Sequence, residues 1–233
     1  MGGSSILFLS GAGLASWVWD EVRTTLPVES VVAAYPKRAD ARLRDFAGSA
    51  LAQAPDGAFT IVAHSAGGAV AGEIVAVAPE RVDGLLGIAA SFPVAGASLL
   101  SALPVPQRVL SGLRMRVVGT RPLQREIRSR LCADLDDSDI GSIVAEYEIG
   151  RIIADFEPES QYLYRDRASP RTFPACCGYV VTTMDRQLTE ALQHKNAAEL
   201  GAGFRREIPT GHLPMVQVRA SLARIVQEFA ACT

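Results

Sequence analysis

The segment Phe59-Thr-Ile-Val-Ala-His-Ser-Ala-Gly-Gly68 joins a short apolar, β-branched run to a cluster of small residues. The run predicts a buried strand, and the small residues predict a sharp turn into a helix. A serine at such a turn adopts a strained backbone conformation, which requires small neighbours two positions away on each side. Ala63 and Gly67 meet that requirement around Ser65. The segment therefore predicts an exposed nucleophilic serine, Ser65, at the positive end of a helix.

The same turn also has a purely structural explanation. Ala63 stands where the pattern G-x-S-x-G has its first glycine. Ser65 would then be only the N-cap residue of the following helix. The choice between the two interpretations depends on whether a base and an acid occur at suitable places elsewhere in the chain.

Composition limits the classes of protein to consider. With 233 residues, 48% of them hydrophobic, the chain is long enough for one large core. Its net charge of −2 gives no electrostatic reason to expect a nucleic acid or an anionic membrane as partner. Alanine is abundant and lysine occurs only at Lys37 and Lys195, a bias typical of high-GC bacterial genomes. We expect a bacterial protein with a small-molecule substrate, and the oligomeric state stays open, a homodimer included.

Neither the N-terminal segment nor the uncharged stretch Leu85–Pro106 predicts a membrane segment. Met1–Ser5 has no basic residue and leads directly into the apolar run Ile6–Leu9, which is too short for a signal peptide. The expected location is therefore the cytoplasm. Leu85–Pro106 is uncharged over a length that could span a bilayer, but prolines and serines interrupt it. We expect a buried strand followed by an apolar pocket wall.

The cysteines do not have the spacing of a metal site. Neither C-x-x-C nor a neighbouring histidine accompanies Cys132, Cys176, Cys177 or Cys232. We expect free thiols in a reducing compartment, no metal and no cofactor.

Apolar runs of strand length alternate with segments of helix length along most of the chain. Such alternation predicts an α/β fold, with a mostly parallel sheet of about six strands covered by helices. The predicted strands are Ile6–Leu9, Val28–Ala34, Phe59–Ala63, Leu85–Ala89, Gly178–Val181 and Phe204–Ile208. Helices are predicted over Ser16–Leu26, from near Leu188, and over Val218–Phe229.

The alternation fails between residues 92 and 172. This stretch contains proline breaks and helical patterns such as Asp139–Phe156, and it far exceeds the usual loop length. We interpret it as a helical cap inserted into a core formed by residues 1–91 and 173–233, above the carboxyl ends of the strands. A separate small domain is the alternative.

Of the three histidines, His212 has the best position for a general base. It lies on a loop between the strand Phe204–Ile208 and the last helix. His64 adjoins Ser65, so an elbow turns its side chain elsewhere, and His194 lies in a polar stretch that is expected to be solvated. A histidine near a helix start can also be structural, but an upstream elbow serine favours the catalytic interpretation.

A catalytic histidine needs a carboxylate that sets its tautomer, and Asp185 follows the strand Gly178–Val181 directly. A helix-capping role for Asp185 is the structural alternative, and Glu190 is a competitor that falls inside the predicted helix. The resulting order is serine, aspartate, histidine, each after a different strand.

Acyl transfer also needs backbone donors for a developing oxyanion. The loop Ser10–Leu14 follows the first strand, and we assign the N–H groups of Ala12 and Ala66 as the two donors. The loop could instead bind a dinucleotide, but Gly11-x-Gly13 lacks the third glycine of that motif.

These features resemble the α/β-hydrolase superfamily, and within it the branch of methyl-ester esterases and hydroxynitrile lyases. The resemblance rests on four segments spread over nearly the whole chain: Ser10–Trp19, Ala63–Gly68, Met184-Asp185 and Gly211–Met215. It implies the α/β-hydrolase fold and a triad of Ser65, Asp185 and His212. Where the family usually begins the oxyanion loop with His-Gly, this chain has Ser10-Gly11.

The resemblance also bears on the type of reaction. Lyases of that branch resemble one another in a threonine near the oxyanion loop and a lysine after the catalytic histidine, and this chain has Gly11 and Leu213 at the similar positions. The sequence therefore favours a serine hydrolase for a small, largely apolar ester, thioester or lactone. The alternatives are a C–C hydrolase or lyase with the same triad, and a hydrolase-fold binding protein or receptor.

The substrate pocket is the least determined part. We expect Leu14, His64, Phe92, Tyr147 and Leu213 to line it. Leu99, Leu100 and Phe156 are further apolar candidates from the insertion, and all could equally be core residues. Arg151 and Arg165 could recognise a carboxylate or simply be solvated.

Overall fold

The computed structural model describes residues 4–133, 135 and 142–232. Its centre is a sheet of six strands in the order β2-β1-β3-β4-β5-β6, in which every neighbouring pair is parallel. This confirms the predicted α/β architecture. The strands are β1 (Ser5–Leu9), β2 (Ser30–Val32), β3 (Phe59–His64), β4 (Val82–Ile88), β5 (Cys176–Thr182) and β6 (Phe204–Ile208).

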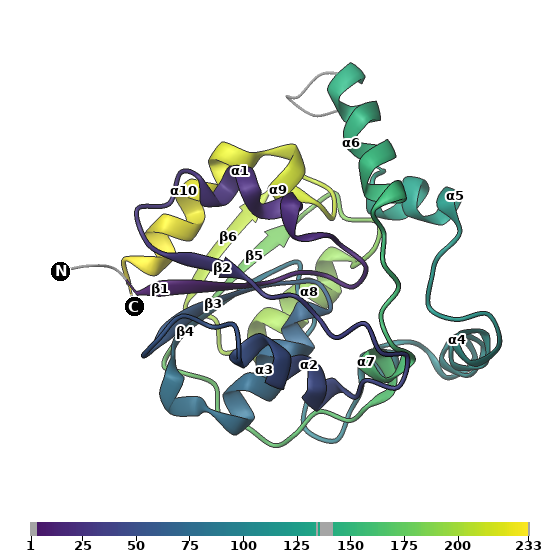
Figure 1. The fold of residues 1–233 in the computed structure, drawn as a ribbon, viewed down its shortest axis with the longest axis horizontal. Helices are drawn as coiled ribbons and strands as arrows, with labels where there is room; N and C mark the ends of the chain where they lie inside the picture. Colours follow the sequence, from purple (N-terminus) through teal and green to yellow (C-terminus); the bar gives the residue numbers. More distant parts are fainter. Residues whose placement is uncertain (1–3, 134, 136–141, 233) are drawn as a thin grey trace.

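Helices cover both faces of the sheet. The α-helices are α1 (Asp20–Arg23), α2 (Leu43–Leu51), α3 (Gly67–Val77), α4 (Val105–Val117), α5 (Gln124–Glu126), α6 (Ser142–Ala154), α7 (Gln161–Arg165), α8 (Glu190–Glu199), α9 (Pro214–Gln217) and α10 (Arg219–Ala230). Short 3-10 turns are η1 (Ser16–Trp19), η2 (Pro79–Arg81) and η3 (Leu99–Ala102), and η4 (Ile127–Leu131) is a π-helical turn. Figure 1 shows α1, α9 and α10 on one side of the sheet and α2 and α3 on the other.

Side chains alternate between the two faces along each strand and so build two hydrophobic clusters. On β1, Leu7 and Leu9 pack into the cluster beneath α2 and α3, whereas Ile6 and Phe8 pack into the cluster beneath α1 and α10. All four side chains are fully buried. Burial on both faces explains why the central strands β1 and β3 appear in the sequence as apolar runs, whereas the edge strand β6 contains three exposed charged residues.

The main departures from the predicted elements occur at their ends. The helix expected over Ser16–Leu26 consists of η1 and the short α1, because Pro27 follows closely and disfavours helical backbone before it. Strand β4 begins at Val82 rather than Leu85, since its first residues include the exposed Asp83 and a glycine, which hide the strand pattern. Strand β2 is shorter than predicted.

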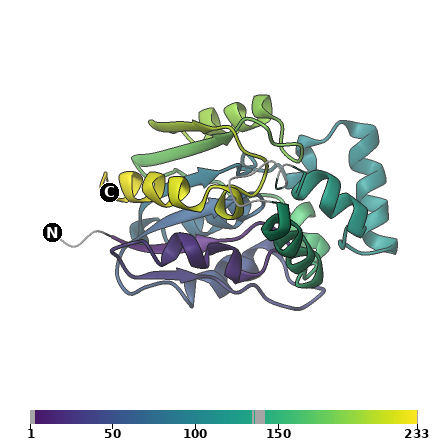
Figure 2. The same ribbon diagram turned by 90° about the horizontal axis from the view of Figure 1, so that it is seen from above.

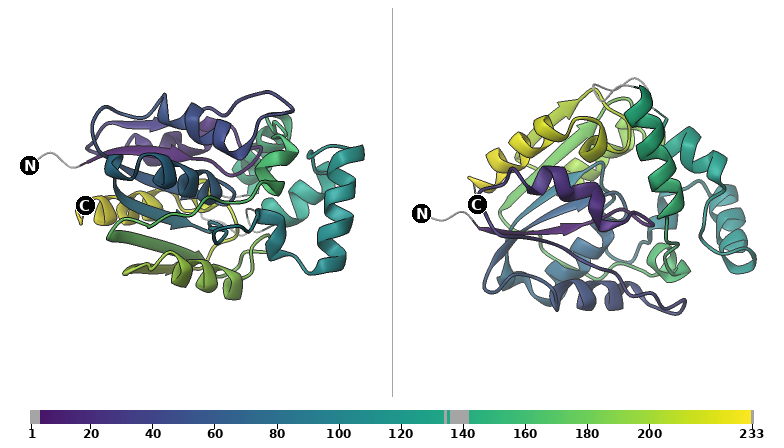
Figure 3. Two further views of the ribbon diagram at one scale, coloured as in Figure 1. Left: turned by 90° about the horizontal axis from the view of Figure 1, so that it is seen from below. Right: turned by 45° about the horizontal axis from the view of Figure 1, so that its top comes forward.

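Helices α4 to α6, from the segment between residues 92 and 172, lie beyond the carboxyl ends of the strands, at one end of the molecule (Figures 1 and 2). Both termini lie at the opposite end (Figure 3). The structure contains the expected helix over most of Asp139–Phe156 as α6; residues 139–141 lie outside the described part. The boundaries of the insertion, and its role as a cap, stay predictions.

Parts of this segment pack on the main body. The backbone N–H of Leu43 and the side chain of Arg42 both bind Asp166. Leu163 of α7 belongs to the cluster beneath α2 and α3. In the described part of the chain, no helix is long and apolar enough to cross a membrane.

Candidate active site

Ser65 stands at the turn between β3 and α3 with a backbone φ of +53°. A residue other than glycine in this left-handed region costs about 1–3 kcal/mol, which the surrounding structure must supply. Two bonds hold the turn: the Ser65 N–H donates to the Ile88 carbonyl at 3.3 Å, and the Ser91 N–H donates to the Ser65 carbonyl at 2.9 Å. The geometry is the strained elbow that the sequence predicts.

The small residues after Ser65 are required by close approach of other backbone. A Cβ atom at Gly67 would lie 2.5 Å from the carbonyl oxygen of Leu9, and one at Gly68 would lie 2.5 Å from that of Ser91. Both distances are far shorter than real contacts. The helix α3 can therefore begin this close to the sheet only with glycine at these two positions.

The structure brings Ser65, His212 and Asp185 together in one chain of hydrogen bonds. His212 Nε2 lies 2.9 Å from Ser65 Oγ, and His212 Nδ1 lies 2.6 Å from Asp185 Oδ2. A carboxylate only accepts, so Nδ1 carries the proton and Nε2 accepts from the serine hydroxyl. His212 is 2% exposed and Asp185 is 8% exposed, which limits competition from water.

Asp185 is held by donors around both carboxylate oxygens. Oδ1 accepts the backbone N–H groups of Gln187 at 2.7 Å and Leu188 at 2.9 Å, while Oδ2 also accepts Thr182 Oγ1 at 3.1 Å. Burial by itself raises the pKa of Asp185, but the hydrogen bond from His212 and the backbone donors outweigh it and hold the pKa below its usual value. Asp185 is therefore an anion at neutral pH.

The competing acid, Glu190, lies elsewhere. It is the first residue of α8, and its carboxylate faces His194 Nε2 at 3.5 Å, on the surface. His194 is 43% exposed at its side chain, as expected for a solvated histidine.

The loop Ser10–Leu14 passes directly against the elbow. A Cβ at Gly11 would lie 2.9 Å from the Cβ of Ser65 and 2.8 Å from His64 Nδ1. Trp19 Nε1 donates to Ser10 Oγ at 3.1 Å, and the Tyr35 hydroxyl donates to the Ser10 carbonyl at 3.1 Å. The serine that replaces the family's usual histidine is thus an acceptor that fixes the loop.

Ala12 and Ala66 line the same pocket as Ser65 and His212. Within the described residues, neither backbone N–H has a hydrogen-bond partner. Two unpaired donors beside a serine hydroxyl are suited to binding an oxyanion.

His64 is fully buried and lies behind the triad. Its Nε2 donates to the His212 carbonyl at 2.8 Å, and the two imidazole rings are 4.7 Å apart. Burial lowers the pKa of His64 to about 3. The side chain is therefore neutral, and it is a packed, hydrogen-bonded neighbour of the triad rather than a wall of the pocket.

The pocket at Ser65 has a volume of about 270 Å³, enough for a small molecule. None of the five side chains predicted to line it does so. His64 and Leu213 are buried beside the triad, Phe92 is buried in the core, and Leu14 lines a different pocket. Tyr147 is 68% exposed because it lies on the outer side of α6.

The walls of the pocket come mostly from the insertion. Besides Ser65, His212, Ala12 and Ala66, the lining consists of Arg114, Met115, Thr120, Pro122, Glu126, Ile127, Arg130, Leu131, Phe156, Tyr164 and Gln187. Of these residues, only Phe156 is among the pocket candidates predicted from the sequence. No periodic sequence pattern distinguishes the other lining residues, because most of them come from the end of α4 and the short, irregular turns that follow it.

The four cysteines, Arg151 and Arg165 do not line the pocket at Ser65. All four cysteines are free thiols, and the described residues contain no cluster of potential metal ligands. The Arg151 guanidinium stacks on Trp17 at 3.8 Å from the ring centroid, and Arg165 donates to Gln161.

Comparison with known proteins identifies the family. A search against curated protein sequences found no significant match. Among solved structures, the methylesterase MES16 from Arabidopsis has a TM-score of 0.75 and 14% identity over 99% of this chain and 100% of its own. Polyneuridine aldehyde esterase has a TM-score of 0.73 and 14% identity over 98% and 99% of the two chains.

A thermophilic esterase from Thermogutta terrifontis has a TM-score of 0.74 and 18% identity over 99% of this chain and 90% of its own. At these identities, structural similarity shows a shared fold. A model of the alpha/beta hydrolase family matches residues 6–225, nearly the whole sequence. The chain therefore belongs to the α/β-hydrolase family.

Proposed function

We propose that the protein is a serine hydrolase that cleaves a small ester, thioester or lactone through an acyl-enzyme. The observation that carries the proposal is the continuous hydrogen-bond chain from Ser65 Oγ through His212 to the buried carboxylate of Asp185. This arrangement lets one imidazole remove the serine proton and keep its own charge compensated. The esterases among the structural neighbours support the same class of reaction.

In the proposed mechanism, Ser65 Oγ attacks the carbonyl carbon while His212 Nε2 takes the hydroxyl proton. Asp185 stabilises the imidazolium and keeps Nδ1 as the protonated nitrogen. The N–H groups of Ala12 and Ala66 bind the oxyanion of the tetrahedral intermediate. His212 then protonates the leaving oxygen or sulfur, and a water molecule activated by the same base hydrolyses the acyl-enzyme.

Two observations favour hydrolysis over cyanohydrin cleavage. Leu213, which stands where related lyases have lysine, is 1% exposed and brings no positive charge to the site. A side chain at Gly11, where those lyases have threonine, would meet both Ser65 and His64 at less than 3 Å. The site therefore offers donors for an oxyanion and no cation at that position for a departing cyanide.

The proposal is tested by labelling with a fluorophosphonate, followed by peptide mapping. We expect one adduct, on Ser65, and none in the Ser65→Ala variant. Ser91→Ala is a matched control, because Ser91 adjoins the elbow and contacts Ser65 through its backbone N–H. An adduct on another serine would overturn the assignment of the nucleophile.

Turnover of a chain-length series of 4-nitrophenyl esters separates an enzyme from a binding protein. We expect burst kinetics or a trappable acyl-enzyme on these esters, and no cleavage of mandelonitrile above background. Rapid cleavage of mandelonitrile without ester turnover would favour a lyase. Labelling of no residue, with no turnover, would favour a binding protein.

A further inference from the structure

The lining of the pocket at Ser65 includes three charged side chains, Arg114, Glu126 and Arg130. Two of them form a pair: Arg114 Nη2 donates to Glu126 Oε2 at 3.0 Å, and the same oxygen accepts the backbone N–H of Leu123 at 2.9 Å. These bonds lower the pKa of Glu126. The carboxylate is therefore ionised, and its charge is balanced by Arg114.

Arg130 has no such partner. It is an exposed residue of the π-helical turn η4, and within the described residues it makes no hydrogen bond or ion pair. Two other arginines of the insertion are engaged: Arg128 forms a two-pronged pair with Glu146 at 2.5 and 2.9 Å, and Arg121 donates to the Phe156 carbonyl at 2.7 Å. The pocket thus contains one positive charge that the described protein groups leave uncompensated.

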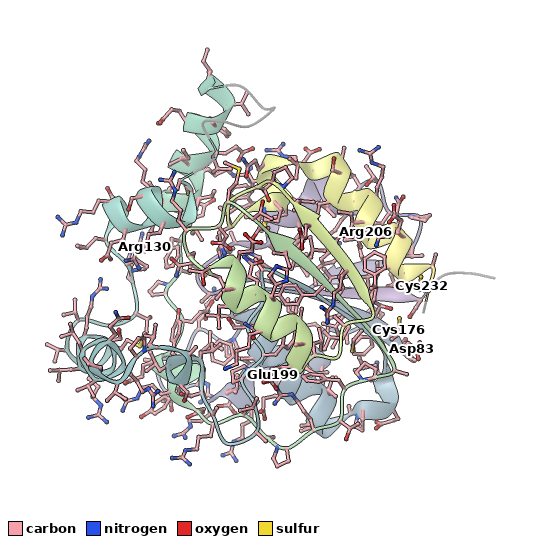
Figure 4. The ribbon with its side chains drawn as sticks, turned by 180° about the vertical axis from the view of Figure 1, so that it is seen from behind. Asp83, Arg130, Cys176, Glu199, Arg206 and Cys232 are labelled. Carbon is pink, nitrogen blue, oxygen red and sulfur yellow. The ribbon has the colours of Figure 1, made fainter. Side chains whose placement is uncertain are left out.

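Figure 4 shows Arg130 beneath the α5–η4 segment, on the side toward α4. Its neighbours along the pocket wall, Ile127, Leu131 and Phe156, are apolar. Apolar walls lower the local dielectric and strengthen an interaction between the guanidinium and an anion. A planar guanidinium also matches the two oxygens of a carboxylate.

We infer that the substrate carries a carboxylate away from its scissile bond, and that Arg130 binds it. This inference rests on the proposed ester hydrolysis and adds a specificity-determining residue and a substrate class to it. Arg130 would bind and orient the ester with its carbonyl at Ser65, and it would take no part in proton transfer. Its exposure limits the expected preference to roughly threefold to fivefold in kcat/KM, with weakening at high salt.

The test compares two matched pairs of chromogenic esters. Mono-4-nitrophenyl glutarate has a carboxylate in place of the terminal ethyl group of 4-nitrophenyl hexanoate, so this pair differs in charge on the acyl side at similar size. Then 5-butanoyloxy-2-nitrobenzoate and 4-nitrophenyl butanoate differ by a carboxylate on the leaving group. For each pair, the kcat/KM of the anionic ester is divided by that of the neutral ester. This ratio for a variant is then divided by the same ratio for the wild type, which removes the difference in intrinsic reactivity between the two esters.

We expect Arg130→Gln to lower this ratio roughly threefold to fivefold in one of the two pairs, which tells on which side the carboxylate binds, and to lower kcat/KM for the neutral ester of that pair less than for the anionic ester. Arg130→Lys should recover part of the loss. Arg125→Gln is the control, because it removes the same charge from neighbouring α5, at a position that does not line the pocket. An equal loss in Arg125→Gln, or loss for neutral and anionic esters alike, would overturn the inference.

Turnover of the neutral esters separates an error in the inferred anion site from an error in the proposed hydrolase function. If neutral esters turn over and Arg130→Gln changes neither ratio, the hydrolase assignment stands and the inference is wrong. If no ester turns over, calorimetric titration with glutarate tests the site directly. Weaker glutarate binding by Arg130→Gln than by Arg125→Gln would then support the anion site, and equal binding would refute it.

Discussion

Replacement of Asp185 by asparagine tests the proposed catalytic chain at its most informative point. The introduced amide keeps the shape of the carboxylate, and its carbonyl oxygen can still accept the backbone N–H groups that now bind Oδ1, at 2.7 and 2.9 Å. The amide NH2 then faces His212 Nδ1, which is 2.6 Å from the present Oδ2. A donor at that place favours the tautomer in which Nδ1 is unprotonated and Nε2 carries the proton.

This tautomer cannot accept the proton of Ser65, because Nε2 is the atom that lies 2.9 Å from the hydroxyl. The variant therefore loses the general base. It also loses the negative charge that stabilises the His212 imidazolium, which water cannot replace because His212 is only 2% exposed. Equivalent replacements in serine triads lower kcat about 10⁴-fold, which corresponds to roughly 5.4 kcal/mol of transition-state stabilisation. We expect a loss of about 10³- to 10⁴-fold here.

The measurements are kcat and kcat/KM on a neutral 4-nitrophenyl ester, together with the rate of fluorophosphonate labelling. Glu190→Gln is the matched control, since it removes one carboxylate charge nearby in the chain, from a surface contact with His194. The reasoning is refuted if Asp185→Asn retains activity within about tenfold of the wild type. Loss of activity in Glu190→Gln alone would transfer the role of the acid to Glu190.

Two further outcomes follow from burial and close packing. The pKa of His64 is about 3 in the folded state, below its ordinary 6.5, so the unfolded chain takes up this proton first as the pH falls. Urea titrations should therefore show the contribution of His64 to the free energy of unfolding falling by about 1.4 kcal/mol per pH unit between pH 6.5 and pH 3. In NMR spectra of the folded protein, the signals of the His64 ring should stay constant down to about pH 4. A ring pKa near 6.5 would contradict this. Gly67→Ala should destabilise the fold by roughly 1–3 kcal/mol and slow the labelling of Ser65 by a fluorophosphonate, because the added Cβ meets the Leu9 carbonyl. The control is Gly48→Ala on α2, where the added Cβ enters open space; this variant should be more stable than the wild type by up to about 1 kcal/mol.

The sheet and the three residues of the proposed triad could be predicted because each depends on short-range signals. Every predicted strand exists, and the central strands are the most apolar because both of their faces are buried. Ser65, Asp185 and His212 each follow a strand, and parallel strands bring their carboxyl ends to one edge. Glu190 could be set aside for the same reason: it begins a helix rather than following a strand.

The pocket could not be predicted, because its walls depend on how one segment folds over the sheet. Tyr147 has the apolar character of a pocket residue, but its place on the helix turns it outward. Glu126 and Arg130 are two of many charged residues in the insertion, and nothing local distinguishes them from Arg125, which does not line the pocket. Arg130 lies in a π-helical turn, in which the Cys132 N–H donates to the Ile127 carbonyl, and no sequence pattern predicts such a turn.

The two parts of the site are held in different ways, and this affects how each tolerates change. The loop with Ala12 is fixed by the core: Gly11 leaves no room between Ser65 and His64, and Trp19 and Tyr35 bind Ser10 from the two hydrophobic clusters. A substitution there disturbs the oxyanion donors and the nucleophile together. Arg130 instead stands on an exposed turn of the insertion, where a new side chain alters the charge of the pocket and leaves the elbow intact. Substrate preference should therefore change with single substitutions between α4 and η4, while the reaction type depends on the packed ends of the strands.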